Sequence, residues 1–362
     1  MPEYRHRRTP SGPGIGVGAG VRRVAAFALT LVACCLLLNQ LVTKRYWRPY
    51  LGQANDKVAR LKEIADRVDV LFIGTSRVVF GIDPALFDAE TATQGMGTDS
   101  FNLGVLDLRA AERDDLMASL RGVPFTRLRY VLVEPALNFT PNVETPMTIR
   151  MRYHYNWSTV PYAMRVKMEA NRPLLLRAAS CAMLGRQLAL NSANLGVLSD
   201  LFFPRVRDDP DASKVVRGYA ADTEPPERLS SDRFREQLAQ SGGKRQIDEA
   251  GAAAPIRELT PTELGYLRSV FDSVRALGAE PIAFFPPQTI ELDSARSLHD
   301  AILRQLPGVR VLAYYYGQGP AELYEDPYAW MDDGHLSRAG AEAFSRRVAR
   351  DFVRATGTTA AR

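Results

Sequence analysis

Three residues of this sequence could together carry out nucleophilic chemistry, although they lie far apart in the chain: Ser76, Asp332 and His335. Ser76 follows an apolar run, VDVLFI, that is cut by Gly74 and Thr75. A serine hydroxyl attacks a carbonyl only if a base takes its proton, and the base needs a third group that fixes its tautomer and stabilises its charge. The spacing Asp-x-x-His lets Asp332 reach the imidazole of His335 while the ring faces a nucleophile.

Each of these residues has a simpler explanation when it is taken alone. Ser76 could cap a following helix, because serine is favoured at helix N-caps. A histidine in a loop beside acidic residues is commonly a surface residue. The conjunction favours a site, because Ser76 comes after the first predicted strand and the Asp332–His335 pair comes just before the last predicted helix. In open α/β sheets, ligands and catalytic groups gather at the carboxyl ends of strands.

Short apolar runs alternate with amphipathic segments beyond residue 68. We expect buried strands near residues 68–73, 101–104, 130–135, 281–285 and 309–313. We expect helices near residues 51–67, 110–120, 261–277, 293–306 and 336–353. This alternation predicts a three-layer, flavodoxin-like α/β fold with a parallel sheet flanked by helices.

A long segment between the third and fourth predicted strands does not continue this pattern. We expect a large helical and loop insertion at about residues 147–258. Aromatic and Leu-rich helical patterns fill residues 147–204. Residues 205–258 are rich in charge, Pro, Gly and Ala, which is typical of a mobile loop.

Charge and cysteine usage exclude several classes of protein. The first 50 residues carry eight Lys or Arg and one acidic residue, whereas the remaining 312 carry 38 basic and 40 acidic residues. The domain beyond residue 50 therefore has no charge signature of nucleic-acid binding. Only Cys181 lies beyond the apolar N-terminal segment, and the four histidines lack metal-ligand spacing. We expect no disulfide, no metal and no cofactor.

The N-terminal region predicts a membrane anchor. Residues 24–42 are apolar apart from Asn39 and Gln40, and as a helix they would span roughly 28 Å, close to the ~30 Å of a bilayer core. Five arginines precede this segment and three Lys or Arg follow it, so the positive-inside rule places the N-terminus in the cytoplasm and the domain outside, in the periplasm. The glycine-rich residues 12–20 are expected to be a flexible lead-in.

These features divide the chain into five parts. They are a basic cytoplasmic tail (1–23), a transmembrane signal-anchor (24–42), a juxtamembrane helix or linker (43–67), the α/β domain with its insertion (68–355) and a C-terminal tail (356–362). A cleaved signal peptide and a lipoprotein modified at Cys34 are alternatives to the signal-anchor, and both place the domain on the same side of the membrane.

Three blocks of the sequence resemble the SGNH (GDSL-like) hydrolase superfamily, over about residues 68–138 and 261–355. Gly74-Thr75-Ser76 stands where the family has Gly-Asp-Ser, Asn102-Leu103-Gly104 resembles the second block, and Asp332-x-x-His335 matches the last. The resemblance implies that Ser76 is the nucleophile and His335 the base, oriented by Asp332. It also implies that the Gly104 N–H helps to form an oxyanion hole.

The sequence departs from the family at two places. Thr75 replaces the usual Asp, and the third block, Gly-x-Asn-Asp, is absent. Asn138, just past the third predicted strand, is the candidate for the missing oxyanion Asn, with a turn residue as the alternative. Glu134 is interpreted as a structural residue at a strand end. Arg77 could meet an anionic substrate group or form a surface ion pair.

Within the superfamily, the single N-terminal span and the runs GTSR, GIDP and DGHLSRAG look most like membrane-anchored extracytoplasmic members. Some of these serve polysaccharide acylation or D-alanine transfer beside a multispanning O-acyltransferase. The resemblance implies a serine esterase or acyltransferase that adds or removes an acyl group, most directly acetyl, on a cell-surface polysaccharide.

Two other hypotheses stay open. The chain could be a non-catalytic subunit of the same fold, whose insertion docks a membrane O-acyltransferase or a glycan exporter. It could also be a lipid esterase that uses Tyr153, Tyr155 and Trp157 near the bilayer.

Overall fold

The computed structural model describes residues 17–50, 52–136, 157, 159–192, 215–217, 219–220, 236, 256–289, 291–332 and 334–357. Its centre is a five-stranded parallel sheet in the order β2-β1-β3-β6-β7. The strands are β1 (Val70–Ile73), β2 (Ser100–Asn102), β3 (Tyr130–Val133), β6 (Glu280–Phe285) and β7 (Arg310–Ala313). The predicted α/β fold with a parallel sheet is confirmed, and each predicted strand forms close to its expected position.

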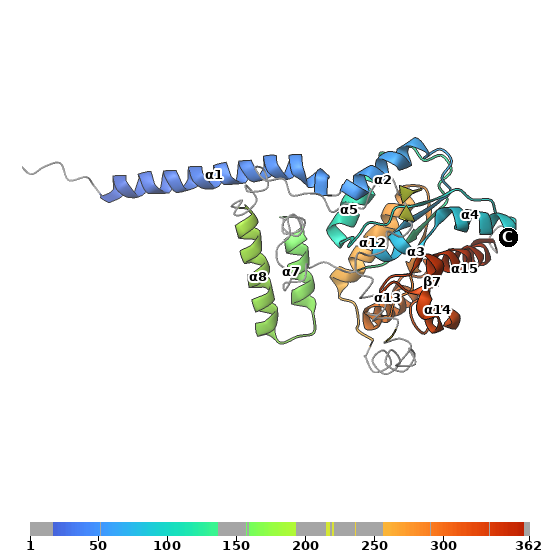
Figure 1. Ribbon diagram of the computed structural model, residues 1–362. Coiled ribbons are helices and arrows are strands. Elements are labelled where there is room, and N and C mark those ends of the chain that lie inside the picture. Colours follow the sequence, from blue (N-terminus) through green and yellow to red (C-terminus); the bar gives the residue numbers. More distant parts are fainter. Residues whose placement is uncertain are drawn as a thin grey trace, which may run out of the picture.

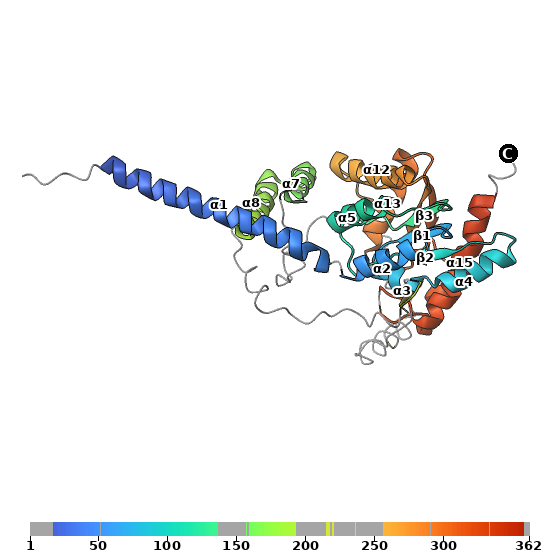
Figure 2. The same cartoon turned by 90° about the horizontal axis from the view of Figure 1, so that it is seen from above.

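Helices cover both faces of this sheet (Figures 1 and 2). One face packs against α2 (Gly52–Glu63), α5 (Ala110–Leu120), α12 (Pro261–Ala276) and α13 (Leu292–Gln305). The other packs against α3 (Ser76–Gly81), α4 (Pro84–Thr93) and α15 (Arg338–Gly357). Successive β1 residues alternate between the two apolar clusters, because side chains alternate across a strand. Both faces are buried, which explains why the strands read as continuous apolar runs.

The strand order creates a switch point beside β1. The chain runs from β1 to β2 on one side and then crosses to β3 on the other side of β1. In such sheets a crevice forms outside the carboxyl ends of the strands where the order reverses. Ser76 begins α3 directly after β1, so the fold places it at this crevice.

Several elements differ from the sequence prediction. The short helices α4 and α14 (Ala321–Glu325) and the 3-10 turn η2 (Pro327–Ala329) were not expected, and α3 was expected only if Ser76 capped a helix. The predicted C-terminal tail begins too early, because α15 continues to Gly357. Thr356 is buried in the last turn, where its hydroxyl donates to the Phe352 carbonyl.

The described part of the insertion contains two elements. The first is a hairpin of two helices, α7 (Thr159–Glu169) and α8 (Leu174–Ser192), in the region where the Leu-rich pattern predicts helical structure. The second is a small antiparallel pair, β4 (Val215–Val216) and β5 (Tyr219–Ala220). The prediction of a loop over 205–258 misses this pair, and most of that range lies outside the described residues.

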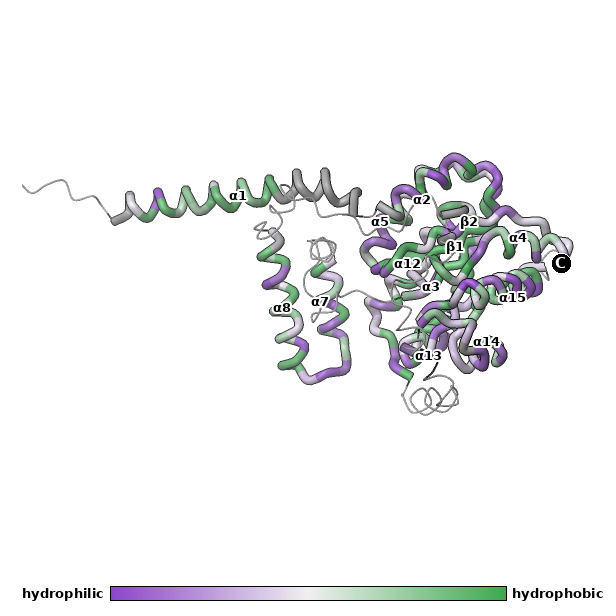
Figure 3. The backbone as a smooth tube through the Cα atoms, in the orientation of Figure 1, coloured by the Kyte–Doolittle hydropathy of each residue, from purple (hydrophilic) through white to green (hydrophobic). Residues whose placement is uncertain are grey.

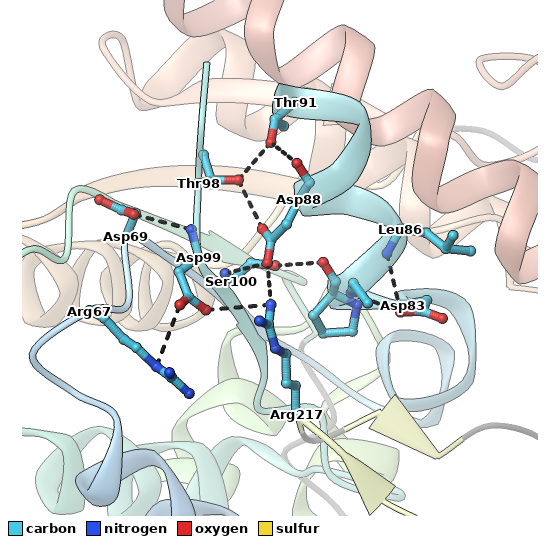
Figure 4. Close-up of polar contacts among 12 residues, drawn as sticks. Arg67, Asp69, Asp83, Leu86, Asp88, Thr91, Thr98, Asp99, Ser100 and Arg217 are labelled. Atoms are coloured by element: carbon cyan, nitrogen blue, oxygen red, sulfur yellow. Dashed lines mark hydrogen bonds and ion pairs between the residues drawn. The ribbon is translucent and has the colours of Figure 1, made fainter. Parts of the chain in front are cut away.

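The turn between β4 and β5 contacts the edge strand β2. The Asn102 N–H donates to the Arg217 carbonyl at 3.0 Å, and Tyr219 is buried. Figure 4 shows the Arg217 side chain between Asp88 and Asp99, with its Nη1 2.6 Å from Asp88 Oδ2. An uncovered edge strand is a site of unwanted strand pairing, and this contact occupies one of the backbone donors of β2.

The N-terminal helix α1 (Val17–Tyr50) projects from the domain (Figure 1). Its segment Gly20–Leu38 is long and apolar enough to cross a membrane and is not buried inside the protein. Figure 3 shows mostly hydrophobic residues along the coloured part of this helix. It begins four residues before the predicted span. The prediction of a flexible glycine-rich lead-in is wrong from Val17 onward, because those residues form the first turn of α1.

Candidate active site

Ser76 is presented at the start of a helix without serving as its cap. Thr75 is the N-cap, with extended backbone geometry and a side chain that accepts from the Arg77 N–H. The interpretation of Ser76 as an N-cap is therefore wrong. Since Ser76 is the first residue of α3, its own N–H has no acceptor within that helix.

His335 and Asp332 lie on the loop between η2 and α15. His335 Nε2 is 2.7 Å from Ser76 Oγ, and His335 Nδ1 is 2.8 Å from each carboxylate oxygen of Asp332. The structure thus brings together the three residues that sequence reasoning joined. An Nδ1–H held by a carboxylate leaves Nε2 as the acceptor for the serine proton.

Buried contacts fix the loop that carries His335. Trp330 and Leu336 pair across its base, and both side chains are buried. The Trp330 indole N–H donates to the Leu323 carbonyl at 2.9 Å. Within the loop, the Met331 N–H donates to the His335 carbonyl at 2.9 Å, and the Gly334 N–H donates to Asp332 Oδ1 at 2.8 Å.

Electrostatics favour the charged form of Asp332. Partial burial alone would raise the pKa of this carboxyl group. Hydrogen bonds from His335 and Gly334, with the attraction of the imidazole charge, outweigh burial and hold the pKa of Asp332 below its ordinary value. Asp332 is therefore a carboxylate at neutral pH and can accept a hydrogen bond from His335 Nδ1–H.

A buried carboxylate from β3 holds the serine turn. Glu134 accepts the Thr75 N–H at 2.6 Å and the Thr75 hydroxyl at 3.1 Å. A side chain on Gly74 would meet Glu134 Oε2 at 2.5 Å, so this turn requires glycine. Arg77 pairs with Glu134 at 3.6 Å and with Glu291 at 3.0 Å. The two predicted roles of Arg77 were contact with an anionic substrate group and an ion pair. The structure shows the ion pair.

The loop after β2 packs directly on α3. Asn102 Nδ2 donates to the carbonyls of Val78 and Ile82 at 2.7 and 2.8 Å. Its Oδ1 accepts from the Gly104 N–H at 2.9 Å. A Cβ on Gly104 would lie 2.7 Å from the Val79 nitrogen, which leaves no room for a side chain. The Gly104 N–H, predicted as an oxyanion donor, is therefore engaged by Asn102 in this structure.

Sequence reasoning gave no role to two further neighbours of the site. Phe80 presents an edge-to-face contact to His335, with ring centroids 5.7 Å apart. Lys57 is buried on α2 and donates to the Gly104 carbonyl at 2.7 Å, and burial lowers its pKa to about 7. Neither has a sequence signal, because each contact joins elements distant in the chain.

Two further predictions concern the oxyanion donor Asn138 and metal binding. Asn138 lies outside the described residues, so its role as an oxyanion donor stays a prediction. Among the residues that the structure describes, no three His, Cys, Asp or Glu side chains gather in a way that could hold a metal ion.

Comparisons with known proteins do not place the chain in a family. No protein-family model matches it, and neither the curated proteins nor the solved structures give a match.

Proposed function

We propose that this protein is a membrane-anchored serine esterase or O-acyltransferase of SGNH type, acting outside the cytoplasm. Its substrate is an O-acyl ester, most directly an acetyl ester, of a cell-surface polysaccharide. The observation that carries the proposal is the continuous chain of hydrogen bonds from Ser76 Oγ through His335 to Asp332, at the carboxyl end of β1.

In the proposed mechanism, Ser76 Oγ attacks the ester carbonyl while His335 Nε2 takes its proton. Asp332 stabilises the imidazolium and keeps Nδ1 protonated. The tetrahedral intermediate collapses when His335 returns the proton to the leaving alcohol, which leaves an acyl group on Ser76. Water or a sugar hydroxyl, deprotonated by His335, then attacks this ester and frees the serine.

The oxyanion needs donors that are fixed before the reaction. The Ser76 N–H is the first, because the helix offers it no acceptor. The Gly104 N–H can serve only if the oxyanion replaces Asn102 Oδ1, which now accepts it at 2.9 Å. The Asn138 amide is the third proposed donor.

Membrane anchorage is part of the same proposal. Arg22 and Arg23 stand at the start of the apolar segment of α1, and positively charged flanks favour the cytoplasmic side. The α/β domain would then face the periplasm, where surface glycans and a multispanning O-acyltransferase partner are accessible.

A second candidate is a non-catalytic subunit of the same fold that docks a membrane acyltransferase or a glycan exporter. The bond between Gly104 and Asn102 favours it, because an occupied N–H is not ready to receive an oxyanion.

Covalent labelling separates the two candidates. A fluorophosphonate probe adds to an activated serine oxygen and releases fluoride. We expect mass spectrometry of the full-length protein in detergent to find the label on Ser76 and to find none in His335→Ala. The exposed Ser294 serves as an internal control. A folded protein in which Ser76 stays unlabelled would support the docking subunit.

A further inference from the structure

Helix α8 exposes an apolar surface that no described part of the chain covers. Leu174, Leu175, Leu176 and Met183 are between 51% and 80% exposed. Four alanines and Arg186 also belong to the exposed surface of the helix: Ala178, Ala179, Ala182 and Ala189 add to its apolar area, and Arg186 is its charged member. The opposite side packs Leu184 and Leu188 against α7. A helix that is apolar on both sides is typical of a protein interior or a membrane.

Helix α7 separates α8 from the α/β domain. The Tyr162 hydroxyl of α7 donates to the Thr262 carbonyl at 2.6 Å. The Glu169 carboxylate accepts from both the N–H and the hydroxyl of Thr262, at 2.9 and 2.7 Å. These bonds attach α7 to the start of α12. In both views α8 lies on the side of α7 away from the domain (Figures 1 and 2).

The orientation of α8 relative to α1 indicates what contacts the exposed apolar surface of α8. Helix α8 contacts α1 at one of its ends and extends away from it, crosswise to the α1 axis (Figure 1). Their contact lies toward the domain side of the apolar segment (Figure 3). A helix perpendicular to a membrane span lies parallel to the bilayer surface. The 19 residues of α8 would cover roughly 28 Å of that surface.

The charges of the hairpin suit a lipid surface. Residues 159–192 contain five basic residues and one acidic residue: Arg165, Lys167, Arg172, Arg177, Arg186 and Glu169. The chain beyond residue 50 as a whole carries more acidic than basic residues. Amphipathic helices that lie in membrane interfaces combine buried apolar side chains with basic residues that meet anionic headgroups.

We propose that α8 is an interfacial membrane helix, which inserts its exposed leucines into the surface of the same bilayer that α1 spans. Such helices sink about 5–10 Å into the boundary between headgroups and acyl chains. The inference rests on the membrane anchorage in the proposed function and is independent of the esterase activity. With α1 and α8 both in the bilayer, the domain is held at two places, which fixes the direction in which its site faces.

Site-directed quenching tests the proposal in the full chain. Cys34, Cys35 and Cys181 are replaced by alanine, and a fluorophore is attached to Leu175→Cys or, as a matched control, to Leu303→Cys. Leu303 is also an exposed leucine on a helix, at 60%, but it belongs to α13 of the domain. Each protein is reconstituted into vesicles of phosphatidylethanolamine and phosphatidylglycerol, and its co-flotation with the vesicles is checked.

We expect a lipid carrying a shallow nitroxide to quench the label at position 175 several-fold more than the label at 303, and aqueous iodide to do the reverse. Equal access of iodide to both labels in co-floating protein would overturn the α8 proposal and leave the anchor intact. A label at 175 that neither quencher reaches would also overturn it, because protein would then cover the helix. Protein that fails to co-float would refute the anchor, and with it this inference.

Discussion

The loop that carries His335 and the α7–α8 hairpin use apolar side chains in opposite ways. Around the site, Trp330 and Leu336 are buried and lock the His335 loop, so the positions of the reactive atoms follow from contacts within the domain. The hairpin has only a small buried cluster, Val160, Ala163, Leu184 and Leu188, and it leaves other leucines of α8 exposed. The fold itself buries the apolar side chains of the first region, whereas those of the second are exposed, and we propose that the bilayer covers them.

The largest expected effect is at the site. Asp332→Asn keeps the size of the side chain, but it removes the charge that stabilises the imidazolium and favours the wrong tautomer of His335. We expect kcat for an aryl ester to fall by about 10⁴. Asp293→Asn, which changes an exposed carboxylate on α13, should leave kcat unchanged. If kcat fell by a similar factor in both variants, the charge of Asp332 would have no specific role in the reaction.

The next effect concerns the loop after β2. Gly104→Ala brings a methyl group within 2.7 Å of the Val79 nitrogen and so pushes this loop away from α3. We expect kcat/KM to fall by about 10²–10³, the cost of losing one oxyanion donor. The control is Gly265→Ala on α12, where a Cβ meets nothing within 4 Å. That variant should gain about 1 kcal/mol of stability, as thermal unfolding can show. An active Gly104→Ala variant would exclude Gly104 from the site.

Lys57 connects stability with pH. Its pKa is lowered by burial from 10.5 to about 7, so between these values the unfolded chain binds the proton and the folded chain does not. The free energy of unfolding should therefore rise between pH 7 and 10, by an amount of the order of a few kcal/mol.

Denaturant unfolding of the full chain in detergent measures this rise. Lys57→Met should abolish it, and Lys62→Met, an exposed lysine on the same helix, should retain it. An identical pH profile for Lys57→Met and the unsubstituted protein would mean that Lys57 is charged in the fold.

The smallest effect tests the hairpin. Leu184→Ala removes a buried side chain and should lower the local stability of α8 by about 2 kcal/mol. Leu175→Ala removes an 80% exposed side chain and should change it in detergent by less than about 0.5 kcal/mol. Hydrogen exchange of the α8 amides compares the two variants. Equal losses would show that Leu175 packs inside the protein.

The sequence predicted the sheet because buried parallel strands are continuous apolar runs, and the run before Ser76 is one of them. It missed α4, although Asp83 caps that helix and Pro84 occupies its first turn, since ten residues give a weak period. It predicted helices in the insertion but neither their pairing as a hairpin nor its direction, because α8 is apolar on both sides and its pattern does not distinguish the packed side from the exposed one.

The pairing of Ser76 with His335 was predictable, since an α/β fold brings strand ends and the last loop to one edge. The supporting contacts were not. Glu134 extends from a neighbouring strand and accepts a hydrogen bond from the Thr75 N–H. The Asn102 side chain is oriented so that its Oδ1 accepts a hydrogen bond from the Gly104 N–H. Such contacts depend on rotamers and on distances between elements, which local patterns do not encode.

The most direct test of the account is hydrolysis of a small aryl acetate by the full-length protein in detergent, compared with Ser76→Ala. The account predicts turnover that is lost on substitution of Ser76 and retained in the exposed-serine control Ser294→Ala. Equal turnover in Ser76→Ala, or none in the folded unsubstituted protein with its candidate acyltransferase present, would contradict a serine esterase or acyltransferase.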